Sequence, residues 1–191
     1  MEAFSDGVIA ILITIMVLEL RPPHGTQWSA LHDSLPALLT YVLSFVYLGI
    51  YWNNHHHMLM ATRQVSGLVL WANLHLLFWL SLVPFTTGWM GENHFAEAPV
   101  AAYGVVLLAS ALAYYALQTT IIRSQGPDSP LAAAVQGDLK GKSSPLLYAA
   151  GIGLSLVNRW IGLAVYVLVA LIWLVPDRRV ERTLTAVEGS G

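Results

Sequence analysis

The chain has 191 residues, of which 56% are hydrophobic and only 10% are charged. Soluble domains carry about 25% charged residues. No water-soluble core of this size could hide so much apolar surface, so the composition excludes a soluble globular protein and predicts an all-α integral membrane protein. The net charge of −2 gives no indication of a nucleic-acid partner, and the absence of cysteine excludes disulfides and thiolate metal sites.

Six apolar segments, each bounded by charges or by proline and glycine, predict six transmembrane helices in one bundle. We expect them at residues 4–20, 35–54, 67–89, 99–122, 145–158 and 160–175. The first would be only about 25 Å long, which is short for a hydrocarbon core of roughly 30 Å. Short helices of this kind suit the interior of a bundle.

The longest connection, residues 123–144, is rich in glycine, proline, serine and charge. It predicts a cytoplasmic loop with a short helix around residues 130–135. Residues 1–176 then form a single six-helix transmembrane unit, and residues 177–191 form a cytoplasmic C-terminal tail.

The distribution of lysine and arginine predicts the orientation in the lipid bilayer, because cytoplasmic segments carry more of both. If the N-terminus is cytoplasmic, seven of the nine basic residues are on the inside and two on the outside. The seven are Arg63, Arg123, Lys140, Lys142, Arg178, Arg179 and Arg182, and the two are Arg21 and Arg159. We therefore expect both termini in the cytoplasm.

The first predicted helix has two different faces, since helical residues advance by about 100° each. Ile11, Ile15 and Leu18 share one line, and Thr14 lies beside it. Asp6 points nearly the opposite way, toward the neighbouring helices. Placing a polar side chain in a transmembrane helix costs free energy, so a polar residue near the end of such a helix usually has a function. The aliphatic stripe alone is consistent with helix packing or with the wall of a pore.

Three consecutive histidines, His55 to His57, end the second predicted helix. The three histidines of one chain cannot coordinate the same ion, because consecutive helical residues point about 100° apart. No His-Glu-x-x-His motif or carboxylate cluster accompanies them, so we expect no metal and no cofactor. We expect instead a structural polar network that ties together one end of the first three helices. Its members are Ser5, Asp6, His55, His56 and Asn73.

Two further predictions concern the third and fifth segments. His75, inside the third segment, is expected to hydrogen-bond within the bundle, with proton sensing as the alternative. Ala149 and Gly153 are spaced by four residues and predict a close helix contact rather than a ligand site.

Several of these residues resemble, in order, the signature of the endolysosomal potassium channel family known as transmembrane protein 175 and its prokaryotic relatives. The family pattern is Arg-x-x-x-Phe-Ser-Asp-x-x-x-Ala-Ile-x-x-Thr, and every element from Phe4 to Thr14 matches. Further matches in the second and third segments are Trp52, His55, His56, Asn73, Pro84, Phe85 and Thr87. The family arginine would precede Met1. Either the native chain starts upstream of Met1, or the protein lacks this charge; in the second case Asp6 would have another partner, such as a histidine, or would be partly protonated.

The resemblance implies a homotetrameric channel in which the first helix of each subunit lines a central pore. It implies that Ile11 forms the pore constriction and that Ile15 and Leu18 form the next aliphatic rings. Thr14 would lie close to the constriction and contribute to potassium selectivity. An isoleucine ring offers no oxygen ligands and can gate by steric closure and dewetting. The expected function is a potassium-preferring cation channel of the plasma membrane, with potassium ions in the pore and no carbonyl filter.

Two alternatives stay open. One is a proton-coupled cation transporter that uses Asp6 and the histidines. The other is a membrane enzyme or haem protein that uses the histidine cluster. Nucleotide-binding and serine-nucleophile motifs are absent from the sequence, so we do not expect an enzyme.

Overall fold

The computed structural model describes residues 1–62, 64–135 and 139–175. Most of these residues are helical, and none of them is in a strand. The elements are α1 (Glu2–Leu18), the 3-10 helix η1 (Trp28–Leu31), α2 (Leu35–Met60), α3 (Gly67–Ser81), α4 (Val83–Glu92), α5 (Glu97–Gln125), α6 (Pro130–Val135), α7 (Leu139–Ser155) and α8 (Arg159–Leu174).

Three helical segments are long and apolar enough to cross a membrane: α2, the continuous pair α3–α4, and α5. The helix α8 is apolar but shorter, and α1 and α7 have 17 residues each. The expectation of an all-α membrane protein therefore agrees with the described part of the chain. The count of six transmembrane helices stays a prediction.

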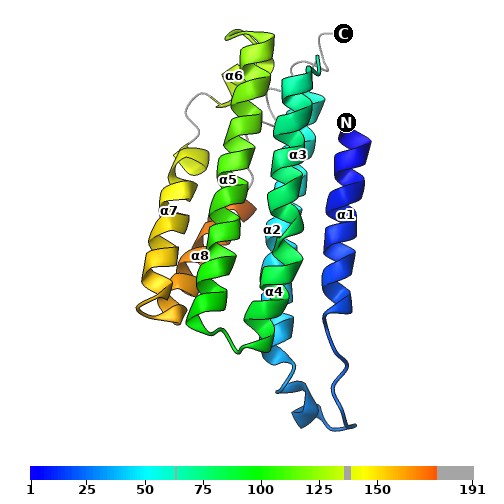
Figure 1. The fold of residues 1–191 in the computed structure, drawn as a ribbon, viewed down its shortest axis with the longest axis vertical. Coiled ribbons are helices and arrows are strands. Elements are labelled where there is room, and N and C mark those ends of the chain that lie inside the picture. The colour runs from blue at the N-terminus through cyan, green and yellow to red at the C-terminus, as the bar shows by residue number, and fades with distance from the viewer. Residues whose placement is uncertain (63, 136–138, 176–191) are drawn as a thin grey trace.

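The helices run roughly along one long axis, with α1 at one edge and α7 and α8 at the other side (Figure 1). The start of α1, the end of α2, the start of α3 and the end of α5 lie at the same end of the bundle, which we call the N-terminal end. Arg123 belongs to this end, whereas Arg21 and Arg159 belong to the opposite end. Arg63, Arg178, Arg179, Arg182 and the tail at 177–191 lie outside the described residues.

Several helices extend beyond the predicted segments. The second was expected to end at residue 54 but continues to Met60. Polar residues do not stop it because they find partners on the helix or beside it; the Asn54 side chain, for example, donates to the carbonyl oxygen of Ile50 at 2.8 Å. The fifth begins at Leu139, so the expected loop at 123–144 is partly helical. The short helix expected around 130–135 is confirmed as α6.

The third predicted segment is interrupted at Leu82, between α3 and α4. Pro84 lacks the backbone N–H that would bond to the carbonyl oxygen of Leu80. The chain nevertheless keeps its direction, so α3 and α4 act as one continuous rod (Figure 1).

A cluster of buried tyrosines joins α2, α5, α7 and α8. Four tyrosine rings from these helices have neighbouring centroids 6.1 to 6.5 Å apart. They are Tyr47, Tyr103, Tyr148 and Tyr166. The hydroxyl of Tyr47 donates to the backbone oxygen of Tyr166 at 2.6 Å. The Tyr166 ring lies directly on Gly104 and Gly151, where a Cβ atom would overlap it. Glycine therefore allows α5, α7 and α8 to approach closely.

The close contact predicted at Ala149 and Gly153 is wrong. Both residues are exposed, and a Cβ atom on Gly153 would meet nothing within 4 Å. The buried residues of α7 are Ser144, Tyr148, Gly151 and Ser155. This stripe turns Gly151 inward and leaves residues 149 and 153 on another face of the helix.

Candidate functional site

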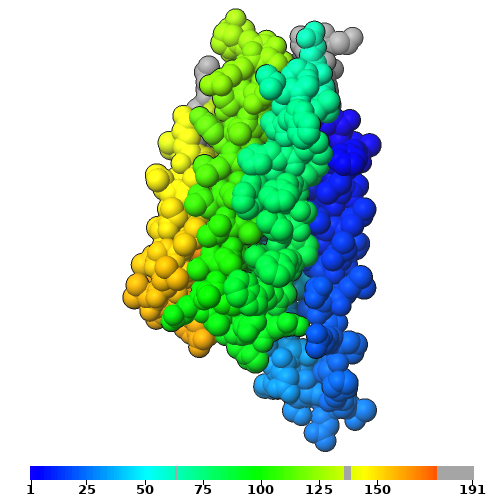
Figure 2. Space-filling view, viewed as in Figure 1, coloured from blue at the N-terminus to red at the C-terminus, as the bar shows by residue number. Residues whose placement is uncertain are grey.

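The helix α1 is attached to the bundle along one face only. It contacts α2, α3 and α4 and forms an edge of the molecule (Figure 2). Its buried residues are Ser5, Ile9, Leu12 and Met16. They recur every three or four positions and therefore make one continuous stripe.

The opposite face of α1 carries the residues expected to line the pore. Ile11, Ile15 and Leu18 are 56%, 41% and 81% exposed. Thr14 is also exposed, and its hydroxyl donates to the carbonyl oxygen of Ile11 at 2.8 Å. A contiguous exposed apolar stripe marks a surface that meets another subunit, lipid or an apolar lumen.

A chain of hydrogen bonds joins α1, α2 and α3 at the N-terminal end. The Nε2 atom of His55 lies 2.7 Å from Oδ1 of Asn73, and Nδ2 of Asn73 donates to Oγ of Ser5 at 2.9 Å. All three side chains are buried. Because an amide oxygen only accepts, the His55 proton is on Nε2. The network therefore has a fixed donor direction that runs from α2 through α3 to α1.

Asp6 and His56 form a separate, half-exposed cluster with Glu2. The Nδ1 atom of His56 lies 3.3 Å from a Glu2 oxygen and 3.4 Å from an Asp6 oxygen. The His56 ring stacks on Trp52, with centroids 5.8 Å apart. Side-chain exposures of 31%, 46% and 28% for His56, Glu2 and Asp6 leave all three side chains partly solvated.

The structure thus divides the five expected network residues into two groups. Ser5 and Asp6 are adjacent in sequence, as are His55 and His56, and adjacent helical residues point about 100° apart. One member of each pair enters the buried chain and the other enters the charged cluster. Glu2 was missed, although its position one turn before Asp6 was the available signal.

The histidines make no three-histidine site among the described residues. His55 is bonded to Asn73 and His56 faces the carboxylates. The ligand atoms of Glu2, Asp6 and His56 do lie within 4.8 Å of one another. This is a mixed carboxylate and imidazole set that sequence analysis did not foresee.

His75 does not face the bundle interior, contrary to expectation. It is exposed on α3, and it accepts a hydrogen bond from Nε1 of Trp79 on the same helix at 3.0 Å. The buried stripe of α3 contains Asn73 and Leu76. His75 is two positions after Asn73, which turns it by about 200° away from the stripe.

Comparison with known proteins places the chain among related membrane proteins. The family described as "Endosomal/lysosomal potassium channel TMEM175" matches residues 1–84. A potassium channel of Chryseobacterium sp. is 53% identical over 184 residues, which cover 96% of each chain. An endosomal/lysosomal proton channel TMEM175 of Gallus gallus is 26% identical over 137 residues, covering 63% of this chain and 27% of that protein.

A solved structure is similar over almost the whole chain. It is the crystal structure of a lysosomal potassium-selective channel TMEM175 homolog from Chamaesiphon minutus. The TM-score is 0.76 at 26% identity, covering 91% of this chain and 94% of the other. The resemblance noted in the first three helices thus extends over the rest of the fold. With this structural agreement and 53% identity to a relative of matching length, the chain belongs to the TMEM175 family.

Proposed function

We propose that the protein is a potassium-preferring cation channel of the plasma membrane. Four copies assemble around a central pore, each contributes α1 to its wall, and both termini lie in the cytoplasm. The observation that carries the proposal is the exposed apolar stripe of α1, which stands free while the opposite face is buried. Relatives named as potassium channels support the choice of ion.

In this proposal Ile11 forms the constriction, and Ile15 and Leu18 form the rings toward the outside. Aliphatic side chains hold back ions by steric closure and by excluding water, not by coordination. The nearest side-chain oxygen on this face is that of Thr14, whose hydroxyl proton is already donated to the Ile11 carbonyl. Its oxygen keeps free lone pairs for a passing cation. Potassium selectivity is therefore modest and no carbonyl filter is involved.

The polar contacts at the N-terminal end would set the rotation of α1. Ser5 is bonded to Asn73, and Asp6 faces His56 from α2. With both positions held, the aliphatic stripe is presented away from the subunit. The network is thus proposed to position the gate, not to conduct ions.

The principal test replaces Ile11 by Asn. Planar-bilayer recording under a potassium/sodium gradient, together with liposome flux, should show increased sodium current or loss of the closed state. The matched control is Ile161→Asn, which changes an exposed isoleucine of α8. Unchanged conductance and selectivity in Ile11→Asn would show that the pore assignment is wrong.

A second variant tests the proposed role of Thr14. Thr14→Val keeps the shape of the side chain but removes its oxygen. We expect conductance to persist while the potassium-to-sodium permeability ratio falls. A ratio equal to that of the unmodified protein would remove Thr14 from the selectivity mechanism.

A second candidate function is proton-coupled cation transport. The half-exposed cluster of Glu2, Asp6 and His56 supplies titratable groups, and the chicken relative is named a proton channel. Because this cluster lies on the bundle side of α1, it is remote from the proposed lumen. Saturable, pH-coupled flux that is lost in His56→Gln, without discrete single-channel currents, would favour the transporter.

A further inference from the structure

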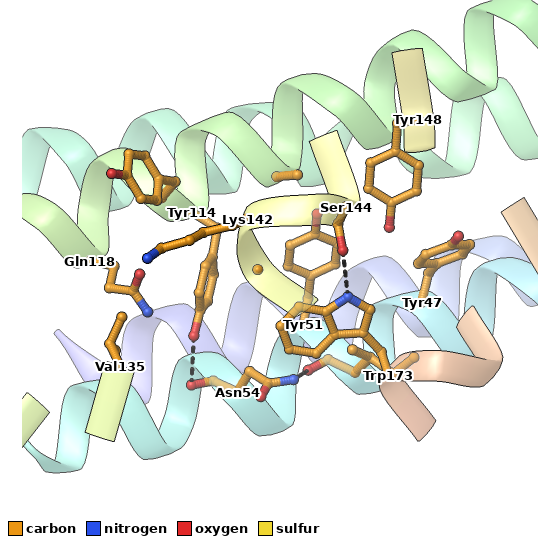
Figure 3. A pocket seen from close by; sticks show the side chains of 14 residues that line it. Tyr47, Tyr51, Asn54, Tyr114, Gln118, Val135, Lys142, Ser144, Tyr148 and Trp173 are labelled. Atoms are coloured by element: carbon orange, nitrogen blue, oxygen red, sulfur yellow. Dashed lines mark hydrogen bonds between the residues drawn. The ribbon is translucent and has the colours of Figure 1, made fainter. Parts of the chain in front are cut away.

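A narrow cavity lies between α2, α5 and the start of α7, and Val135 of α6 and Trp173 of α8 complete its wall (Figure 3). Aromatic side chains dominate its walls, among them Tyr47, Tyr51, Tyr148 and Trp173. Its volume is about 60 Å³, roughly the space of four to six water molecules. It is therefore large enough for a short stretch of a slender chain and too small for a ring system or cofactor.

Several polar groups in the cavity wall are engaged in hydrogen bonds. Nε1 of Trp173 donates to Oγ of Ser144 at 2.8 Å, and the Tyr114 hydroxyl donates to the backbone oxygen of Asn54 at 3.2 Å. Figure 3 shows both bonds beside the cavity. With these groups satisfied, the surface offered to a ligand is mainly apolar.

The mouth of the cavity differs from its interior in charge and exposure. Lys142, in the first turns of α7, lines the cavity and is exposed. None of the ion pairs among the described residues involves it. Tyr115 on α5 is 53% exposed and lines the same cavity. The cavity therefore opens at the surface between Tyr115 and Lys142, and the Lys142 charge has no ion-pair partner among the described residues.

The cavity lies beside Asn54, where the second transmembrane segment is expected to end. Asn54 lies six residues before the end of α2, and Tyr47 lies seven residues deeper, about 10 Å along the helix. The cavity thus runs from the N-terminal end into the apolar depth of the bundle. Basic pockets between transmembrane helices bind anionic lipid head groups.

We propose that this cavity binds the stretch of one acyl chain nearest the head group of an anionic phospholipid, whose phosphate is held by Lys142. A groove open to the side at this depth is in contact with lipid. The cation at its mouth favours a negative head group, and the apolar interior favours a hydrocarbon tail. The proposal requires a membrane around the bundle but does not depend on the pore assignment.

The first experiment measures lipid binding by native mass spectrometry on the purified full chain. It compares phosphatidylglycerol with phosphatidylcholine of identical acyl chains. We expect preferential retention of phosphatidylglycerol, and in Lys142→Gln we expect that preference to fall about fivefold. Arg159→Gln, the same charge change at the opposite end, serves as the control. An equal effect of the two variants would overturn the assignment of Lys142.

The second experiment fills the cavity without changing charge. Ala111 lines the cavity, whereas Ala116 on the same helix is exposed outside it. Ala111→Phe should lower retention of both lipids, and Ala116→Phe should not. In the Ala111→Phe background, Lys142→Gln should have no further effect, because the two residues serve one site. Additive effects would show separate sites and overturn the proposal.

Inorganic phosphate separates a lipid site from a simple anion site. We expect millimolar phosphate to leave bound phosphatidylglycerol in place, because most of the binding comes from the buried chain. Displacement by phosphate, with no effect of Ala111→Phe, would make Lys142 an anion contact only. Thermal unfolding provides a check on folding: phosphatidylglycerol should raise the Tm of the unmodified chain more than that of Ala111→Phe.

Discussion

The helix α1 and the group α5–α7–α8 are attached to the bundle by different means. In α5–α7–α8, glycine lets backbones approach, and Tyr166 lies directly on Gly104 and Gly151. In α1, the glycine at position 7 is exposed, and a Cβ atom there would meet nothing within 4 Å. Attachment of α1 instead combines directional polar contacts at one end with a single apolar stripe.

The difference indicates that the two regions have different tasks. Close glycine packing fixes helices over their whole length and makes a rigid support. Hydrogen bonds at one end fix the rotation and height of a helix but leave its other face free. This is the attachment expected of a helix that presents side chains to a lumen. The following variants test the comparison, in order of decreasing expected effect.

The largest effect is expected from Gly104→Ala. The added Cβ atom would overlap the Tyr166 hydroxyl and would lie 2.8 Å from Cγ1 of Ile152. Overpacking of this kind destabilises by about 1–3 kcal/mol, measurable as a lower Tm in detergent. Gly153→Ala is the control, since its Cβ atom has open space. Equal Tm values for the two variants would contradict the packing account.

A smaller effect is expected from Asn73→Leu, which removes the central member of the buried hydrogen-bond chain. Interhelical hydrogen bonds in membranes contribute about 0.6–1.7 kcal/mol. We expect faster amide hydrogen exchange in the first turns of α1 and little change in α7 or α8. Asn53→Leu, at an exposed position of α2, is the control. Exchange that rises equally in all helices would argue against a local attachment of α1.

His56→Gln should lower the free energy of unfolding by less than Asn73→Leu does, because the cluster with Glu2 and Asp6 is partly solvated. Exposed ion pairs contribute about 0–1 kcal/mol. Salt screens such pairs, so the stability difference between the unmodified chain and the variant should shrink in 1 M salt, where the screening length is about 3 Å. A difference that is independent of salt would mean that His56 acts through packing on Trp52.

The smallest effect is expected at the opposite end of α1. Arg21 donates to Glu92 at 3.2 Å, but the side chains are 87% and 60% exposed. Arg21→Ala should therefore leave Tm and hydrogen exchange of α1 nearly unchanged. A decrease in Tm comparable to that caused by Asn73→Leu would show that α1 is held at both ends.

The sequence predicted much of the polar site because polar side chains in apolar helices need partners. Ser5, Asn73 and His55 stand in three different helices, and their hydrogen bonds join residues that had been grouped together in advance. The division into a buried chain and a charged cluster was not foreseen, nor was the participation of Glu2. Which atoms meet depends on the distance and rotation between helices, which periodicity does not supply.

The errors at His75 and at Ala149–Gly153 have the same cause. In each case spacing along one helix was correct, but the face turned toward the bundle was a different one. A small-residue motif or a polar residue shows which positions share a face. It does not show which face is buried, because that depends on the neighbouring helices.

By itself, the sequence determined that this is a helical membrane protein and that α1 has an aliphatic face opposite Asp6. Both follow from local rules, since length, hydropathy and the advance of about 100° per residue need no partner. Only the tertiary structure decided that the aliphatic face stands free, that Tyr166 packs on Gly104, and that a cavity opens beside Lys142. The physical reason is that side-chain directions within a helix are set by its own backbone. Contacts between helices depend on side chains far apart in the chain.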